Sequence, residues 1–207
     1  LVGFSMKSKG ITQQIQSPKT EISATLCYPY KTQAKAQVCF DATFYDIVDL
    51  PKSCKRSNVE LSQSGQGAPV GITKIEAKAD AKDGFAHPLF TIHFKNLQKG
   101  RVLTSSAQSN FKQICGEQFT QGGAAGIDKS YFNKISVKAT ISSNIPMVCS
   151  PAVVNLESDD PKTDCKVDES FILENKGMVF TTPLTIEADY AYLDILQKKI
   201  EIERIQE

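Results

Sequence analysis

Two stretches near opposite ends of the chain alternate between apolar and polar residues over a long span. They are residues 20–40 (TEISATLCYPYKTQAKAQVCF) and residues 182–202 (TPLTIEADYAYLDILQKKIEI). The two superpose with Tyr28 on Tyr190, an offset of 190 − 28 = 162 residues. A period of two puts apolar side chains on one face of a β-strand and polar side chains on the other. The repeat predicts two related β units, the first of which lacks its front part.

The first of these stretches is too long for an ordinary straight strand. At ~3.3 Å per residue it would run about 70 Å, well beyond the usual strand length. We therefore expect the chain to bend, or to turn near Lys31–Gln33. Pro29 cannot donate a backbone hydrogen bond, which favours an edge position. For the second stretch, the alternation predicts a strand over residues 194–207 in preference to an amphipathic helix.

Shorter alternating stretches fill the middle of the chain. The sequence predicts strands at Val70–Ala77, Leu89–Lys95, Arg101–Ser105, Lys134–Ser142, Pro146–Val154 and Cys165–Glu174. We expect loops over residues 79–88 and 106–126, and a hairpin turn at residues 175–177. Short strands between turn signals, without a long segment of helical period, predict an all-β fold of antiparallel, immunoglobulin-like β-sandwich units.

Residues 46–69 are rich in Ser, Gly, Gln and Pro, which is typical of a linker. We place a boundary near residue 60. Residues 1–60 would then be the C-terminal part of a first β-sandwich unit plus the linker, and residues 61–207 a second Ig-like domain. The first unit offers about three strands, too few to bury both faces of a sheet. Its missing strands either lie upstream or are donated by a neighbouring subunit through β-augmentation.

The six cysteines indicate a disulfide-stapled fold. Their number is even and no C-x-x-C spacing occurs, so the common zinc and thioredoxin patterns are absent. The pairing that we put first is Cys149–Cys165, whose closure would contribute about 3 kcal/mol. The second is Cys39 with Cys54 or with Cys27, and Cys115 takes a partner that remains. Disulfides imply an oxidising compartment, or the interior of a hyperthermophile.

Bulk composition removes several classes of partner. The chain has 207 residues with a net charge of +1, so nothing in it attracts nucleic acid or an anionic membrane. No apolar run approaches the roughly 18 residues that span a bilayer, which predicts no membrane span within this chain. Hydrophobic residues make up 41% of the sequence, enough to build a core.

Few residues invite chemistry, and each has a structural explanation that we prefer. His87 and His93 lack an adjacent catalytic or metal-binding pattern, and we expect both at the surface. The glycines of residues 65–67 lack the lysine of a phosphate-binding loop and predict a tight turn. The four tyrosines of the repeat fall on the apolar faces and predict core packing.

An acidic loop offers oxygen ligands for Ca²⁺ without an EF-hand pattern. We expect it to be solvated, and its acidic residues are Glu157, Asp159, Asp160, Asp164 and Asp168.

Four segments carry a resemblance to a known group of proteins. They are residues 27–41 (CYPYKTQAKAQVCFD), 64–76 (SGQGAPVGITKIE), 90–102 (FTIHFKNLQKGRV) and 181–202. In this order they resemble archaeal exported or membrane-anchored surface proteins with Ig-like, CARDB-like β domains. The resemblance covers most of the chain and is weakest over residues 105–130. It implies a β fold, brings no catalytic residue, and implies an anchor and the front of the first domain upstream of Leu1.

Taken together, the sequence predicts a non-enzymatic extracellular structural or adhesion protein of an archaeal cell surface. Its expected partner is protein, chiefly itself, in a pilus-like filament assembled by β-strand donation. We expect no catalytic residue, no cofactor and no metal. The alternative is an envelope binding module that recognises a ligand or a protein through the 105–130 loop, in which Gly122–Gly126 provides flexibility.

Overall fold

The computed structural model describes residues 5, 19–43, 51–61, 65–82, 85–114 and 129–201. Most of them are in antiparallel β-strands, which confirms the all-β, antiparallel character of the fold. The strands are β1 (Lys19–Asp41), β2 (Val59–Glu60), β3 (Val70–Lys82), β4 (Phe85–Asn96), β5 (Arg101–Thr104), β6 (Lys134–Ile141), β7 (Ile145–Ser150), β8 (Val153–Asn155), β9 (Lys162–Val167) and β10 (Val179–Glu201). The described helices are all short: η1 (Ser105–Asn110), α1 (Phe111–Ile114), η2 (Lys129–Tyr131) and α3 (Glu169–Glu174).

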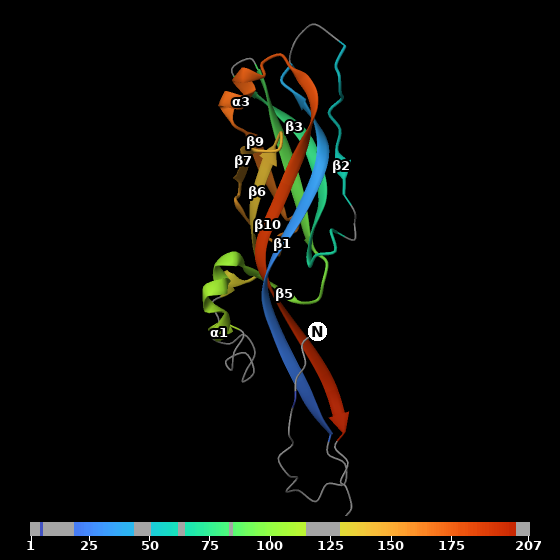
Figure 1. Ribbon diagram of the computed structural model, residues 1–207, viewed down its shortest axis with the longest axis vertical. Coiled ribbons are helices and arrows are strands. Elements are labelled where there is room, and N and C mark those ends of the chain that lie inside the picture. Colours follow the sequence, from blue (N-terminus) through green and yellow to red (C-terminus); the bar gives the residue numbers. More distant parts are fainter. Residues whose placement is uncertain are drawn as a thin grey trace, which may run out of the picture. The chain divides into compact units, whose positions relative to one another are not determined.

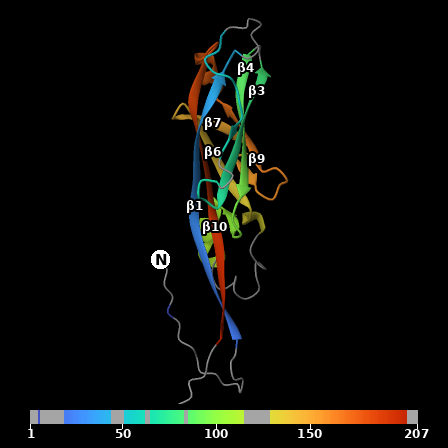
Figure 2. The same cartoon turned by 90° about the vertical axis from the view of Figure 1, so that its right-hand side faces the viewer.

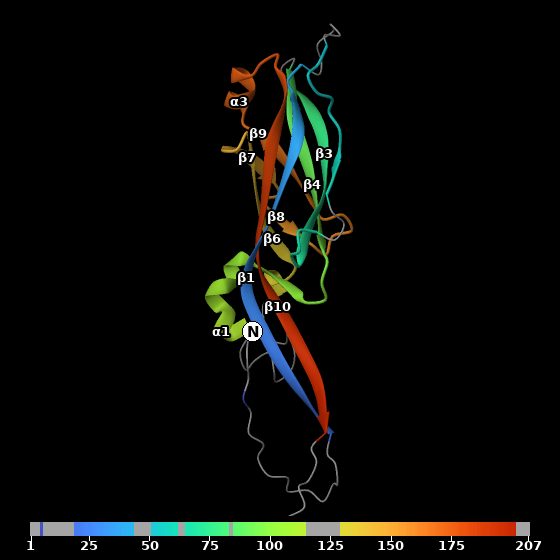
Figure 3. The same cartoon turned by 45° about the vertical axis from the view of Figure 1, so that its right-hand side comes forward.

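Both tyrosine-containing repeats are strands, and they lie side by side. The strand order is β1-β10-β6-β7-β9-β4-β3-β2, with β5 on β10 and β8 on β6. Figures 1 and 3 show β1 and β10 running next to each other. β1 ends the order, which confirms the edge position expected from Pro29. The expected turn near Lys31–Gln33 is wrong, because β1 continues through these residues without interruption.

The sheet curls so that its first strands reach β3, near the other end of the strand order (Figure 2). Thr32 of β1 donates from Oγ1 to the carbonyl oxygen of Val70 at 2.8 Å. The Tyr190 hydroxyl of β10 accepts from the Val70 amide at 3.1 Å and lies 2.9 Å from Thr32 Oγ1. Side-chain hydrogen bonds from β1 and β10 therefore meet at Val70, the first residue of β3.

β7 lies between the two halves of the curled sheet, which are β1-β10-β6 on one side and β9-β4-β3-β2 on the other. Its first residues, Ile145 and Pro146, pair with β6, and its remaining residues, Met147 to Ser150, pair with β9. This change of partner along one strand continues the curled sheet from β6 to β9. The inner faces of both halves contribute to one apolar core, which includes Phe40 of β1, Phe90 of β4, Ile135 of β6 and Ile186 of β10.

A smaller apolar cluster covers the opposite face of β10. Leu103, Ala107, Ile114, Ala191 and Leu193 are its buried members. Residues 106–114, expected to be loop, lie in η1 and α1, and these helices supply two of these side chains. The alternation along the chain gives no sign of these helices because they are only six and four residues long. Residues 115–128, with Cys115 and Gly122–Gly126, lie outside the described residues.

Three further expectations about single elements are wrong. Residues 79–82 and 85–88, expected to be loop, are strand, because Ala79 pairs with Pro88 and Asp80 with His87. Pro88 is tolerated since β9 first pairs with β4 one residue later, at Leu89. The predicted strand at Cys165–Glu174 stops at Val167, and α3 follows it. Asp168 caps this helix by accepting from the Ser170 amide at 2.9 Å. The turn at residues 175–177 therefore joins a helix to β10, not two strands.

Disulfides tie strands and connections together. Cys149 of β7 bonds to Cys165 of β9, the pair that the sequence puts first. Cys39 bonds to Cys54 and not to Cys27. Cys27 is also disulfide-bonded, and none of the described cysteines is free.

The chain folds into two compact units. One is Thr25–Asp194, and the other combines Leu1–Ala24 with Ile195–Glu207. In the second unit the residues of β1 and β10 are mostly exposed and none is buried. Residues on both sides of the predicted boundary at residue 60 contribute to the core of the Thr25–Asp194 unit. The division into 1–60 and 61–207 stays a prediction.

Candidate functional site

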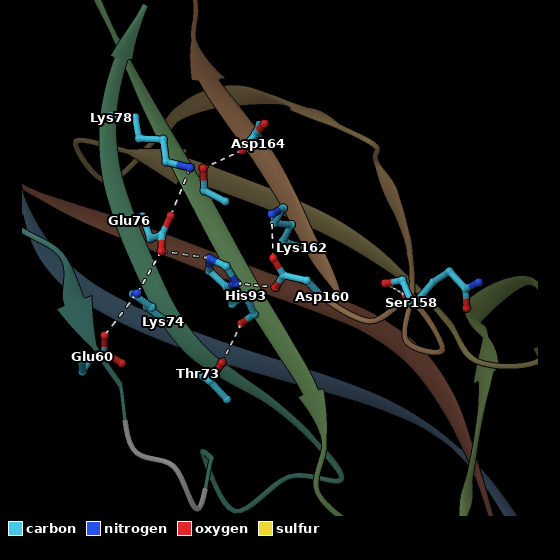
Figure 4. A network of polar contacts seen from close by, with 12 residues as sticks. Glu60, Thr73, Lys74, Glu76, Lys78, His93, Ser158, Asp160, Lys162 and Asp164 are labelled. Carbon is cyan, nitrogen blue, oxygen red and sulfur yellow. Dashed lines mark hydrogen bonds and ion pairs between the residues drawn. The ribbon is translucent and has the colours of Figure 1, made fainter.

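The densest polar cluster lies on the outward face of β3, β4 and β9 (Figure 4). Lys74 and Glu76 come from β3, His93 from β4 and Lys162 from β9. Lys74 and Glu76 point to the same side because alternate residues of a strand share a face. Asp160 approaches from the connection between β8 and β9. The cluster thus unites residues that the sequence analysis considered separately.

His93 sits at the centre of this cluster, clamped between two carboxylates. Its Nδ1 lies 2.9 Å from Asp160 Oδ1, a hydrogen-bond distance. Its Nε2 lies 3.6 Å from Glu76 Oε1, which is too long for a hydrogen bond, and this buried atom has no hydrogen-bond partner among the residues that the structure describes. The side chain is only 18% exposed, so His93 is on the outward face, as expected, but is not an open surface imidazole.

Lysine ammonium groups surround the same carboxylates. Lys74 Nζ lies 2.9 Å and Lys78 Nζ 3.1 Å from Glu76, and Lys162 Nζ lies 2.6 Å from Asp160. Hydrogen bonds from Lys74 and Lys78 lower the pKa of Glu76 from 4.5 to about 2. Hydrogen bonds from Lys162 and then His93 lower the pKa of Asp160. Both carboxylates are therefore ionised at neutral pH, which suits them to accept hydrogen bonds and not to donate a proton.

A hollow of about 370 Å³ lies beside His93, lined by Glu60, Thr73, Lys74, His93 and Lys95. It coincides with an irregularity in the β3–β4 ladder between Ile72 and Lys74, where Thr73 has no opposite residue. Such bulges redirect neighbouring side chains and often border binding sites. Its lining of ammonium, hydroxyl and carboxylate groups suits a polar, charged ligand.

The acidic residues considered for Ca²⁺ are directed to different partners. Glu157 accepts from the Asn133 amide group, Asp164 from the Thr91 hydroxyl, and Asp168 caps α3. Across the part of the chain that the structure describes, no three His, Cys, Asp or Glu residues come together in a way that would hold a metal ion.

The glycine-containing segment at residues 65–67 forms a turn, as expected. Gly65 and Gly67 have φ of +68° and +74°, a region that glycine enters without strain. Between them, Gln66 accepts from the Ile72 amide and donates to the Ile72 carbonyl oxygen, both at 3.0 Å. Sequence reasoning missed this amide clamp, since a glutamine in a turn carries no local signal for it.

The four tyrosines of the repeat pack together, which confirms the core interpretation. Tyr190 and Tyr192 are 0% and 1% exposed. The Tyr30 ring stacks on Tyr190 at 5.7 Å, and the Tyr28 ring lies 5.9 Å from Tyr192. The Tyr192 hydroxyl also accepts from the Gly100 amide at 2.7 Å. These contacts hold strands in place and leave no ring face of Tyr190 free for a ligand.

A second hollow, of about 420 Å³, is lined by Arg101, Lys129, Phe132, Asn133 and Glu157. The Arg101 guanidinium lies 5.7 Å from the centre of the Phe132 ring, within cation–π range. Asn133 has φ of +56° and is fixed by two backbone hydrogen bonds, to the carbonyl of Val102 and from the amide of Leu156. This hollow borders the segment that the sequence analysis named as a binding loop.

No described helix is long and apolar enough to cross a bilayer. Comparison of the chain with protein-family models, with curated proteins and with solved structures gives no match. The case for function therefore rests on the chemistry of the chain itself.

Proposed function

We propose that this protein is a non-enzymatic structural or adhesion protein of an archaeal cell surface, built from Ig-like β-sandwich units. The observation that carries the proposal is that every described cysteine is disulfide-bonded. Disulfides persist in oxidising surroundings outside the cytosol. Strands that change partners make the corners between packed sheets, and the change of partner along β7 supports the sandwich.

The positions of the disulfides suit an exposed scaffold. Cys149–Cys165 links β7 and β9, which are already hydrogen-bonded neighbours. Cys39–Cys54 fastens the end of β1 to the segment that precedes β2. Closures of 15 and 16 residues each remove about 3 kcal/mol of chain entropy from the unfolded state. Such closures resist unfolding of a protein that works without cytosolic chaperones.

The proposal includes assembly into a filament by β-strand donation. The unit that contains Lys19–Ala24 and Ile195–Glu201 has no buried residue among these strand ends. Ile195 and Leu196 are 37% and 59% exposed. Two strands without a covered face are marginally stable alone, and their edges accept a further strand. A strand from a neighbouring subunit would supply the missing contacts.

Two experiments test the proposal. For location, intact cells are labelled with a membrane-impermeant amine-reactive reagent, and free thiols are alkylated during lysis. We expect the protein in the labelled surface fraction, with its described cysteines not alkylated. For assembly, Ile195→Lys with Leu196→Lys should shift the protein to smaller species in light scattering. Val153→Lys, which changes another exposed apolar residue, is the matched control. A cytosolic protein with free thiols contradicts the surface role, and a monodisperse, stable wild-type monomer contradicts strand donation.

The second candidate is an envelope binding module that uses the 105–130 region. The hollow lined by Arg101, Lys129, Phe132, Asn133 and Glu157 supports it, because its two cations suit an anionic group and its aromatic ring suits an apolar group of the same ligand. Arg101→Ala with Lys129→Ala, and deletion of Gly122–Gly126, should each reduce capture of such a ligand. Unchanged capture by both variants would count against this candidate.

A further inference from the structure

Two strands on the outward face repeat one charge pattern. Residues 74–80 read KIEAKAD and residues 162–168 read KTDCKVD, so both follow Lys-x-acid-x-Lys-x-Asp. The first segment lies on β3 and the second on β9 with the residue that follows it. Since a period of two keeps these side chains on one face, each strand presents charges in the order plus, minus, plus, minus.

The ladder registers align the two patterns across β4. Lys74 pairs with His93, which pairs with Lys162. By the same registers Glu76, Thr91 and Asp164 form a second row, and Lys78, Leu89 and Lys166 a third. Asp80 and His87 begin a fourth row, and share a hollow with Glu169. The charged side chains of β3 and β9 therefore alternate in sign from row to row, about 6.7 Å apart along the strands, and Glu60 and Asp160 add negative charge beside the lysines of the first row.

Such a face selects its partner by pattern and not by net charge. A polyanion or a polycation would meet a repelling row every second step. A partner must carry the same alternation in the opposite phase. Turning this face over by a two-fold axis between the second and third rows reverses the order of the four rows. The inner rows, Glu76 with Asp164 and Lys78 with Lys166, then meet with opposite sign, so this part of the face is complementary to itself, as a two-fold symmetric interface requires.

We infer that this charge-banded face (rows led by Lys74, Glu76, Lys78 and Asp80) binds the same face of a second copy in an antiparallel, two-fold symmetric dimer. Glu76 and Asp164 of one copy lie against Lys78 and Lys166 of the other. The acidic neighbours of the first row, Glu60 and Asp160, lie at its two ends, on β2 and on the connection before β9.

The existing ion pairs within one copy do not block this contact. Lys78 bonds Glu76 at 3.1 Å and Lys166 bonds Asp80 at 2.7 Å, and their lysine side chains are 49% and 54% exposed. Exposed pairs contribute little, so their charges are available for exchange. The face measures about 20 Å along the strands and about 10 Å across β3, β4 and β9, which is small for a stable interface. The dimer is therefore weak, with a dissociation constant in the micromolar range or above, and sensitive to salt.

Sedimentation velocity on charge-swapped variants tests this inference, in the Ile195→Lys, Leu196→Lys background so that strand donation does not contribute. Variant A carries Lys78→Glu and Lys166→Glu, and variant B carries Glu76→Lys and Asp164→Lys. Each alone places like charges against each other in the dimer. Mixed together, A and B restore opposite charges at both contacts. Lys35→Glu with Lys138→Glu, on exposed positions of β1 and β6, gives the same change in net charge as variant A and is the control.

At low salt we expect the parent to dimerise at high micromolar concentration, and the association constant to fall at least tenfold in 0.5 M salt. A and B alone should fall by a similar factor, the control should not, and the mixture should recover. If B fails to fold, Lys74→Glu mixed with Asp80→Lys tests the same exchange between the first and fourth rows on β3. A monomeric parent, an unaffected variant A, or a mixture that stays monomeric overturns the inference. None of these results bears on surface location, which the surface-labelling experiment tests separately.

Discussion

Removing one buried hydroxyl, with Tyr190→Phe, tests how the curled sheet is held. The hydroxyl accepts from the Val70 amide at 3.1 Å, and the side chain is fully buried. Phenylalanine leaves that amide without an acceptor in the core, which costs about 1–3 kcal/mol. The Thr32 hydroxyl keeps its own acceptor, the Val70 carbonyl oxygen at 2.8 Å. We therefore expect a loss of about 2 kcal/mol in the free energy of unfolding, or roughly 4–8 °C in Tm.

Chemical denaturation of Tyr190→Phe beside Tyr30→Phe is the assay. Tyr30 stacks on Tyr190, and within the described part of the chain its hydroxyl makes no hydrogen bond, so its variant should stay within about 0.5 kcal/mol of the parent. Combining Tyr190→Phe with Thr32→Val should show a coupling of about 1 kcal/mol. Hydrogen exchange of the Val70 amide should accelerate only in Tyr190→Phe. Equal stability of the two single variants would refute the bond between β10 and β3 as a source of stability.

Three further predictions follow from other contacts. Cys149→Ala with Cys165→Ala should lower the free energy of unfolding by about 3 kcal/mol in denaturant titration. A change below 1 kcal/mol would contradict the stabilising role of this disulfide. The pKa of Glu76 is about 2 in the folded protein, against 4.5 ordinarily. Its contribution to stability is therefore present above pH 4.5 and disappears as the pH falls toward 2. Glu76→Gln should flatten the plot of unfolding free energy against pH in that window, and an unchanged slope would refute the Lys74 and Lys78 contacts. Gly100→Ala should lower Tm measurably, since its Cβ would overlap the Tyr192 hydroxyl and the Leu193 carbonyl oxygen, and an unshifted melting curve would contradict that close approach.

The strands could be predicted from the sequence where the alternation is long and the faces differ in polarity. β6, with Ile135, Val137, Ala139 and Ile141 on one side, is buried as its pattern predicts. β1 and β10 follow the same rule, and Pro29 identified the edge. In each case the local period sufficed, because one face of the strand packs on the core and the other does not.

Pairing and curl lay beyond that local pattern. A single strand as long as the first repeat is rare, which is why the sequence favours a bend or turn near Lys31–Gln33. The structure instead gives this repeat a partner of equal length, β10, from the far end of the chain. The helix α3 escapes the pattern because its first apolar residues, Phe171 and Ile172, continue the apolar content of β9, while the deciding signal is the cap at Asp168.

The outward polar cluster shows a similar division between pattern and placement. The polar face of β4 with His93 could be predicted from its alternation. Its neighbours could not, since Glu76 and Asp160 reach His93 only through the β3–β4 register and the connection before β9. A partner set by sheet register depends on long-range pairing, which a single sequence does not reveal.

The most direct test of the proposed surface role is the thiol state of the protein in its native cells. Thiols would be alkylated before lysis, and peptides mapped by mass spectrometry without a reductant. We predict one linked peptide pair for Cys39 with Cys54, a second for Cys149 with Cys165, and Cys27 in a linked peptide as well. Alkylated, unlinked Cys149 and Cys165 would contradict both the pairing and the oxidising location on which the structural role depends.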